Sequence, residues 1–313
     1  MRERDAFLEK TGREMDQMQK LGKCAGVGRA GVKRKRNVVL PFFMGALAFM
    51  CCYPILFLVT GSLMGQGEAA ENLRPVFSGA EDFASWSVIP FEPTLRSYVE
   101  LIFDTPDFFV MFWNSMKITG GILLGQAVFG IPAAWGFARY RFRFRRGLFF
   151  LYIVMMMMPF QVMMLSDYLV IRWMGLMDTM AAIILPGIFS TLPVFIICQF
   201  FKEIPEELLE AARIDGAGEG DIFFRIGLPL GKAGIISALV LQFLECWNML
   251  EQPMAFLKTP SLWPLSMFQP QITAETAGAA FAASVFALLP AIWVFLAGHE
   301  FLEQGIQAYC GNV

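Results

Sequence analysis

Long apolar stretches alternate with shorter polar ones over most of this chain. Residues 37–67 contain no charged side chain, and a helix needs only about 20 apolar residues to cross a bilayer. Five further apolar stretches follow, so the pattern predicts an all-α membrane protein with six transmembrane helices. The expected spans cover residues 38–64, 114–137, 147–166, 179–201, 233–254 and 277–298.

Two tails flank the membrane domain, which we expect to comprise residues 37–301. Residues 1–36 hold 11 Lys/Arg and five Asp/Glu and end on a basic cluster, which indicates a cytoplasmic tail anchored at lipid headgroups. The first span is too long for the core of a secretory signal peptide, so we expect the mature protein to retain it. Residues 302–313 form a short C-terminal tail.

Composition and charge support this arrangement and predict its orientation. Hydrophobic residues make up 56% of the chain, which includes 32 Phe and 20 Met, and the mean hydropathy is +0.54. If both tails and the stretches 139–146 and 202–232 lie on one side, that side holds 20 Lys/Arg and the other side only 4. Cytoplasmic loops are enriched in these bases, so we expect both termini in the cytoplasm.

The polar loop between the fourth and fifth spans, residues 203–230, has the signals of a helix–turn–helix. Pro205, followed by two acidic residues, is typical of a helix start. Gly216 is expected to end this helix in the left-handed conformation. Asp221 can cap a second short helix that Pro229 ends. Such a projecting unit would suit a docking contact with a partner protein.

The residues of this loop resemble the signature loop of ABC-importer permease subunits. The stretch from Arg213 to Ala217, RIDGA, is the form typical of the carbohydrate-importer branch, and Asn114-Ser115 lies where that branch has an Asn-Ser pair. Because about eight positions agree over twenty residues, an ordinary cytoplasmic loop with an alanine-rich helix is the weaker interpretation. The loop residues that agree are Glu210, Ala211, Ala212, Asp215, Gly216, Ile226, Leu228 and Pro229.

The resemblance implies the type I ABC-importer permease fold, with a cytoplasmic coupling helix, in a bacterial plasma membrane. It implies a heterodimer with a second permease subunit, driven by two ATP-binding ATPase subunits. An extracytoplasmic solute-binding lipoprotein would deliver a sugar or oligosaccharide. In that arrangement Glu210 pairs with a basic group of the ATPase, Ala211 and Ala212 allow close approach, and Gly216 forms the bend.

The fifth expected span has unusual polar residues near its end. On a continuous helix Glu245, Asn248 and Gln252 would share an arc of about 60°, and such groups avoid lipid. They predict either the lining of a translocation path or a structural polar patch against the partner subunit. The family often has an acid after Trp-Asn, where this chain has Met249, so the acid that takes this role stays open. The path candidates are Glu245, Trp247, Asn248, Glu251 and Gln252.

No motif predicts chemistry within the chain itself. The sequence has no glycine-rich phosphate loop, no catalytic set and no metal-ligand set, so we expect no catalytic residues, metal or cofactor. The arginine- and aromatic-rich stretch 139–146 could suggest base stacking. Between two spans it indicates a headgroup anchor instead, and no nucleic-acid partner is expected.

Other transport functions stay open at this point. The same kind of importer could carry a non-sugar solute, such as a polyamine or an amino acid. An ion-coupled secondary transporter or channel could use Glu245 and Glu251 as a proton or cation site. A membrane enzyme is the weakest alternative because no catalytic set is visible.

Overall fold

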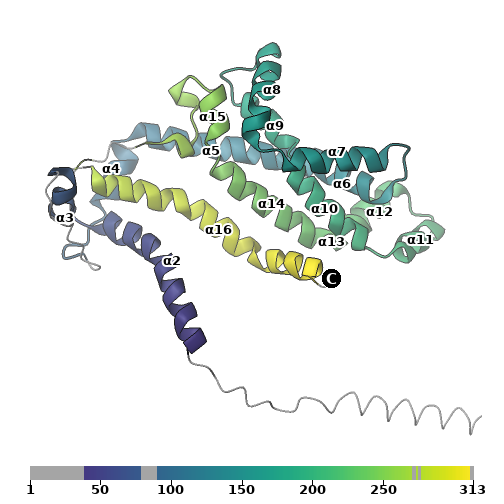
Figure 1. Cartoon of the computed structure of the whole chain (residues 1–313), viewed down its shortest axis with the longest axis horizontal. Helices are drawn as coiled ribbons and strands as arrows, with labels where there is room; N and C mark the ends of the chain where they lie inside the picture. The colour runs from purple at the N-terminus through teal and green to yellow at the C-terminus, as the bar shows by residue number, and fades with distance from the viewer. Residues whose placement is uncertain (1–38, 79–89, 270–272, 274–275, 311–313) are drawn as a thin grey trace, which may run out of the picture. The chain divides into compact units, whose positions relative to one another are not determined.

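The computed structural model describes residues 39–78, 90–269, 273 and 276–310, and within these ranges the chain forms helices joined by turns and loops (Figure 1). The expected basic tail, residues 1–36, lies outside them. The helices are α2 (Val39–Leu63), α3 (Gln66–Ser78), α4 (Arg96–Phe103), α5 (Pro106–Gly125), η1 (Gln126–Gly130), α6 (Ile131–Arg139), α7 (Arg145–Met157), α8 (Phe160–Trp173), α9 (Ala181–Ile188), α10 (Thr191–Glu203), α11 (Glu206–Ile214), α12 (Glu219–Ile222), η2 (Phe223–Gly227), α13 (Leu228–Leu230), α14 (Lys232–Trp247), α15 (Glu251–Phe256), η3 (Pro260–Leu262), η4 (Leu265–Met267) and α16 (Ala277–Cys310).

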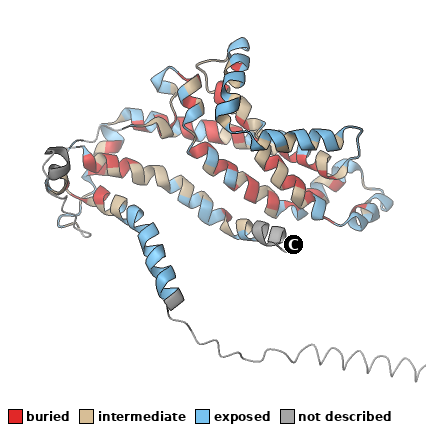
Figure 2. Ribbon diagram, in the orientation of Figure 1, coloured by how far each residue is buried: buried red, intermediate tan, exposed pale blue. Residues whose placement is uncertain are grey.

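The chain divides into two compact units, Met1–Pro54 and Ile55–Val313. The described part of the first unit is the beginning of α2, where large apolar side chains are exposed: Phe42 is 77% exposed and Met50 is 73% exposed (Figure 2). An all-apolar exposed helix is what a lipid environment favours.

Four helical stretches are long and apolar enough to cross a membrane: Pro41–Leu63, Pro106–Arg139, Ala181–Glu203 and Ala277–Glu303. Two bent pairs pass the same test together, which gives up to six spans in the described residues. One pair is α7 with α8, bent by 107°, and the other is Glu219–Leu230 with α14, bent by 70°. The helix expected over 277–298 continues to Cys310, so most of the expected C-terminal tail is helical.

The third expected span is broken where the sequence analysis expected a continuous helix over 147–166. α7 ends at Met157, and Met158 and Pro159 adopt extended conformations with ψ of 126° and 147° before α8 begins. Proline disfavours the helical conformation of the residue before it and supplies no backbone N–H. These two effects explain the 107° bend between α7 and α8.

The fifth span also ends earlier than expected. α14 stops at Trp247 rather than continuing to residue 254, and α15 follows as a separate short helix. Pro253 cannot donate to the carbonyl of Met249, which a continuous helix would require. That carbonyl accepts the hydroxyl of Ser266 instead.

The core of the second unit lies between helices that are far apart in the sequence. α14 packs against both α16 and α10, and α10 packs against α6. Buried residues gather on α6, α10 and α14, whereas α7 has no buried residue (Figure 2). Gln126 is fully buried, and its Nε2 donates to the carbonyls of Gly187 at 3.1 Å and Ser190 at 3.2 Å. This side chain satisfies backbone groups at the break between α9 and α10.

Candidate functional site

The loop between α10 and α14 forms the expected helix–turn–helix. Gly216 has φ of +86°, which confirms the expected left-handed end of α11. The Gly216 N–H donates to the Arg213 carbonyl at 3.1 Å, and the Ala217 N–H donates to the Ala212 carbonyl at 3.0 Å. This pair of bonds is the Schellman arrangement, and it satisfies carbonyls that the end of a helix leaves free.

Two details of the predicted loop are wrong. Pro229 does not end the second helix, because it lies inside α13 and the helical stretch Glu219–Leu230 continues past it. Asp221 lies inside α12, and the position before this helix is held by Gly218. Asp221 forms an ion pair with Arg225 at 3.3 Å instead of capping the helix. The helix begins earlier because Gly218, in an extended conformation, already turns the chain into it.

The loop is fixed to the spans by apolar contacts. Leu209 of α11 and Ile222 of α12 have no exposed surface and belong to one cluster with Trp135 of α6 and Phe201 of α10. The rings of Trp135 and Phe201 lie edge to face with centroids 5.0 Å apart. The loop is therefore in close-packed contact with α6 and α10, which leaves α11 little room for independent motion.

The signature residues divide into two groups by exposure. Ala212, Ile226 and Leu228 pack against this cluster. The exposed members are Glu210, Ala211, Asp215, Gly216 and Pro229. None of the ion pairs found between described residues includes Glu210. Its carboxylate is therefore available to a basic group of a partner.

Arg139, at the end of α6, is a residue of this site that the sequence analysis missed. Its side chain is 7% exposed, and its Nη1 donates to the Glu206 carboxylate at 3.0 Å. Nη2 donates to the carbonyls of Phe201 and Ile204 at the end of α10. One guanidinium therefore joins α6, α10 and α11. The sequence shows only one arginine among five in the stretch 139–146, and nothing local distinguishes it.

Arg213 joins the two helices of the loop. It pairs with Glu206 at 3.4 Å and with Glu219 at 2.9 Å. The hydrogen bond from Glu219 raises the pKa of the Arg213 guanidinium, and Glu206 adds to this effect. Each exposed pair stabilises the loop only slightly. Together with Arg139 they form a continuous charged network along the inner side of α11.

The path candidates lie near the other end of the stretch α5–η1–α6, which covers 34 residues, or about 50 Å at 1.5 Å per residue. Because α14 ends at Trp247, the arc expected for Glu245, Asn248 and Gln252 on one continuous helix does not form. Glu245 and Asn248 are exposed. The Glu251 carboxylate accepts two hydrogen bonds from Gln161 Nε2 of α8, at 2.7 and 2.9 Å.

Trp247 is buried in the core of this unit, which corrects its place among the path-lining candidates. The indole stacks on Phe243 with centroids 5.6 Å apart and meets the ring of Phe112 edge to face at 5.9 Å. Its Nε1 donates to the Ala287 carbonyl of α16 at 2.9 Å. Trp247 therefore supports the exposed polar residues beside it by packing α14 against α5 and α16.

The Asn-Ser pair of the sequence analysis has a defined structural role at this end. Asn114 Nδ2 donates to the carbonyls of Ser261 at 2.8 Å and Trp263 at 3.1 Å, and Ser115 Oγ accepts the Leu265 N–H at 2.7 Å. Asp178, in the left-handed region with φ of 60°, accepts three hydrogen bonds from Lys258 and Thr259. These groups hold the 258–265 segment against α5 and α9.

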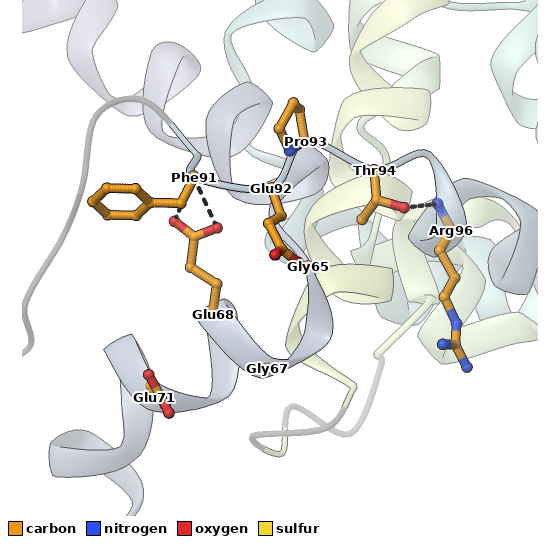
Figure 3. A pocket seen from close by; sticks show the side chains of 9 residues that line it. All are labelled: Gly65, Gly67, Glu68, Glu71, Phe91, Glu92, Pro93, Thr94 and Arg96. Carbon is orange, nitrogen blue, oxygen red and sulfur yellow. Dashed lines mark hydrogen bonds between the residues drawn. The ribbon is translucent and has the colours of Figure 1, made fainter.

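A separate cavity of about 780 Å³ lies between α3 and the segment before α4 (Figure 3). It is lined by acidic residues with one base, Arg96, at its edge. The Phe91 N–H donates to both Glu68 oxygens, at 3.1 and 3.2 Å. The cavity does not include any of the sequence-predicted site residues.

Comparison with known proteins identifies the kind of chain that carries these features. The family model of the binding-protein-dependent transport system inner membrane component matches residues 126–308. The arabinooligosaccharides transport system permease protein AraQ of Bacillus subtilis is 29% identical over 86% of this chain and 94% of its own length. Protein LplC of the same organism is 31% identical over 74% of this chain and 73% of its own. The lactose transport system permease protein LacG of Rhizobium radiobacter is 25% identical over 88% of this chain and 96% of its own.

A solved structure shares the fold. A chain in the crystal structure of a bacterial ABC transporter involved in the import of the acidic polysaccharide alginate superposes with a TM-score of 0.73, over 87% of this chain and 98% of that chain, at 19% identity. The present chain therefore has the helical fold of an ABC-importer permease. With the family match over more than half of its length, it belongs to the family of binding-protein-dependent transport system inner membrane components.

Proposed function

We propose that this chain is the permease subunit of an ATP-driven importer that carries a sugar or oligosaccharide. The observation that supports this most is the construction of α11: its outer side presents Glu210 and Ala211 to a partner, while Leu209 and Arg139 tie its inner side to the spans. An ordinary connecting loop needs neither the buried anchor nor the exposed carboxylate. A helix built in this way transmits force from a partner to the membrane helices.

The partners follow from this role. Two ATPase subunits bind α11 and its counterpart on a second, different permease subunit, and an extracytoplasmic lipoprotein delivers the solute. The sequence has no phosphate-binding loop of its own, so ATP hydrolysis belongs to the partners. The distribution of Lys/Arg supports a cytoplasmic position for the α11 loop and both termini.

Carbohydrate is the preferred cargo for two independent reasons. Relatives that align over most of this chain bear names of arabinooligosaccharide and lactose permeases. In addition, Glu245, Asn248 and the Gln161–Glu251 pair expose carboxylate and amide groups beside α14. Such groups donate to and accept from hydroxyls, which a sugar offers in number.

Transport requires that closure of the ATPase dimer change the access to the path. In our proposal the ATPases move α11, the buried cluster with Leu209 carries the movement to α10 and α6, and Arg139 prevents α11 from pivoting independently. α10 packs on α14, so the movement reaches the polar residues at the end of α14. The steps after the first use contacts between described side chains or helices.

The test is uptake into proteoliposomes that contain the complete complex. The binding protein is first screened against a panel of sugars, polyamines and amino acids, and uptake of the bound solute is then measured with and without ATP. Sugar uptake that requires ATP and the binding protein supports the proposal. ATP-independent uptake driven by an ion gradient would instead favour a secondary transporter that uses Glu245 and Glu251. Binding of a polyamine or an amino acid alone would retain the importer and reject the carbohydrate cargo.

A further inference from the structure

The short connection between α6 and α7 concentrates positive charge in a way that the importer function does not explain. Arg141, Arg143, Arg145 and Arg146 lie within six residues, and the last two occupy the first turn of α7, where no acidic residue is present. The N-terminal end of a helix carries partial positive charge and favours acids. Four arginines at this place repel one another and the helix dipole unless an anion joins them.

The arginines have few partners within the protein. Ion pairs found between described residues do not include any of the four. Arg145 donates to the Ala138 carbonyl at 3.1 Å, and Arg143 lies over the ring of Phe144, 5.9 Å from its centroid. The ring contact of Arg143 uses none of its N–H donors, so Arg141, Arg143 and Arg146 can all bind an oxyanion, for which the fork of donors of a guanidinium is well suited.

The arginines of this cluster line two adjoining hollows. One, of about 660 Å³, is lined by residues 141–147. The other, of about 290 Å³, is lined by Arg145, Arg146 and Lys202 together with Phe137 and Phe149. Because Arg145 and Arg146 line both hollows, they form one basic depression with aromatic walls. Lys202 Nζ lies 4.4 Å from the centroid of Phe149, which keeps a fifth positive charge at its edge.

Exposed apolar side chains lie on more than one side of α7, where Phe150 and Met157 are 68% and 77% exposed, and one stripe of them begins at this depression. Phe144, Leu148, Leu151 and Met155 repeat at helical spacing, and they are 69%, 47%, 53% and 38% exposed. Phe149 and Tyr152 of the same helix pack against the core. An exposed apolar stripe that begins at a cluster of arginines is complementary to an anionic phospholipid. The phosphodiester would lie at the arginines and an acyl chain would lie along α7.

We propose that the α6–α7 connection and the outer side of α7 form a binding site for an anionic phospholipid, such as phosphatidylglycerol. Arg141, Arg143 and Arg146 bind the phosphodiester, and the stripe from Phe144 to Met155 holds an acyl chain. The site lies at the same end of the unit as α11, because Arg145 contacts Ala138 and Arg139 of the same helix end contacts Glu206. A bound lipid would hold the end of α6 that carries Arg139.

The experiment uses the assembled complex in detergent and measures the dissociation constant of fluorescent phosphatidylglycerol, with phosphatidylcholine as the neutral comparison. Replacement of Arg141, Arg143 and Arg146 together by Gln should weaken phosphatidylglycerol binding about fivefold per arginine, or about 100-fold in total. The matched control replaces Lys117, Arg172 and Lys258, exposed bases outside this depression, by Gln. This control should leave the dissociation constant within twofold of the wild type.

Two further measurements separate a lipid from other anions. Leu151→Ser should also weaken phosphatidylglycerol binding several-fold, because it interrupts the acyl stripe while retaining every arginine. Inorganic phosphate at millimolar concentration should not displace the lipid. Displacement by phosphate, an unchanged constant in Leu151→Ser, or equal affinity for phosphatidylcholine would each overturn the proposal. Phosphatidylglycerol binding that appears only after the ATPase subunits are stripped from the complex would assign this surface to a protein partner and overturn the proposal as well. Co-purification of the ATPase with the triple variant shows that the variant is folded.

Discussion

Arg139 Nη1 lies 3.0 Å from Glu206 Oε2, and this contact joins the last residue of α6 to the first residue of α11. The guanidinium also binds the carbonyls at the end of α10. Three helices that are distant in the sequence thus meet at one side chain. The position of the docking helix depends on this contact as much as on the signature residues themselves.

Arg139→Gln should therefore uncouple transport. The shorter amide cannot reach Glu206 and both carbonyls, and leaving such groups without partners costs about 2 kcal/mol. We expect a lower melting temperature and a large loss of uptake, with the ATPase still bound through the exposed side of α11. The control is Arg225→Gln, which breaks only the exposed pair with Asp221 and should change stability by about 0.5 kcal/mol or less. Equal effects of the two variants would contradict the role of Arg139.

Gly216 tests whether the bend meets a partner. A Cβ at this position has no atom of this subunit within 4 Å, so within the subunit only the positive φ opposes substitution, at about 1 kcal/mol. Asn tolerates this conformation better than Val does. Gly216→Val should lower the melting temperature more than Gly216→Asn. Both should abolish uptake, because either side chain projects into the ATPase groove. Uptake at the wild-type rate in Gly216→Asn would remove the bend from the docking surface.

Glu210 tests the charge of that surface. Glu210→Lys should leave the subunit folded but weaken ATPase binding, because it places a positive charge where a basic partner group is expected and an unpaired buried charge is unfavourable. Glu207→Lys makes the same change at an exposed position of α11 outside the signature. The measurement is ATPase retained on purified complex and uptake in proteoliposomes. The same loss in both variants would point to the general charge of α11 rather than to Glu210.

The end of α14 separates residues that face the path from residues that support it. Glu245→Gln and Asn248→Ala should reduce uptake with no change in melting temperature, since both side chains are exposed. Trp247→Phe should lower the melting temperature and leave uptake unchanged. It loses the hydrogen bond to the Ala287 carbonyl, which is worth about 1 kcal/mol. Uptake as a function of sugar concentration and thermal unfolding are measured for all three. Normal uptake in both polar variants would leave them as a structural patch.

Asp178 should make the 258–265 segment sensitive to acid. Hydrogen bonds from the Thr259 hydroxyl and from the Thr259 and Lys258 N–H groups lower the pKa of the Asp178 carboxyl. The charged form is therefore favoured in the folded state. Its stabilising effect is present above the unfolded pKa of about 3.9 and is lost as the pH falls through the lower folded value.

The variant Asp178→Asn tests this, since Asn also tolerates the positive φ. Hydrogen exchange of Lys258 and Thr259 should be faster in the variant at pH 7, and the difference should shrink towards pH 3. Thr179, whose hydroxyl donates to the Leu176 carbonyl without an acid, serves as the control through Thr179→Val. A difference for Asp178→Asn that does not depend on pH would contradict the role of the charge.

The sequence by itself determined the class of the fold and the docking loop. Apolar stretches long enough to cross a bilayer and the spacing of Glu210, Gly216 and Pro229 are local properties, because they depend on residues close together in the chain. For the same reason the left-handed end of α11 at Gly216 could be predicted. The prediction that Asp221 caps the second helix was wrong. Gly218, only a few residues earlier, holds the position before this helix instead.

Only the tertiary structure decided which side chains work together. Arg139 and Glu206 are 67 positions apart, and Gln161 and Glu251 are 90 apart, so no periodic pattern relates them. The burial of Trp247 depends on α5 and α16 rather than on its neighbours in α14. The Met249 carbonyl, which Pro253 cannot bond, likewise finds its donor in Ser266, 17 positions away. Such partners exist only after the helices have packed, because packing brings together groups that the sequence keeps apart.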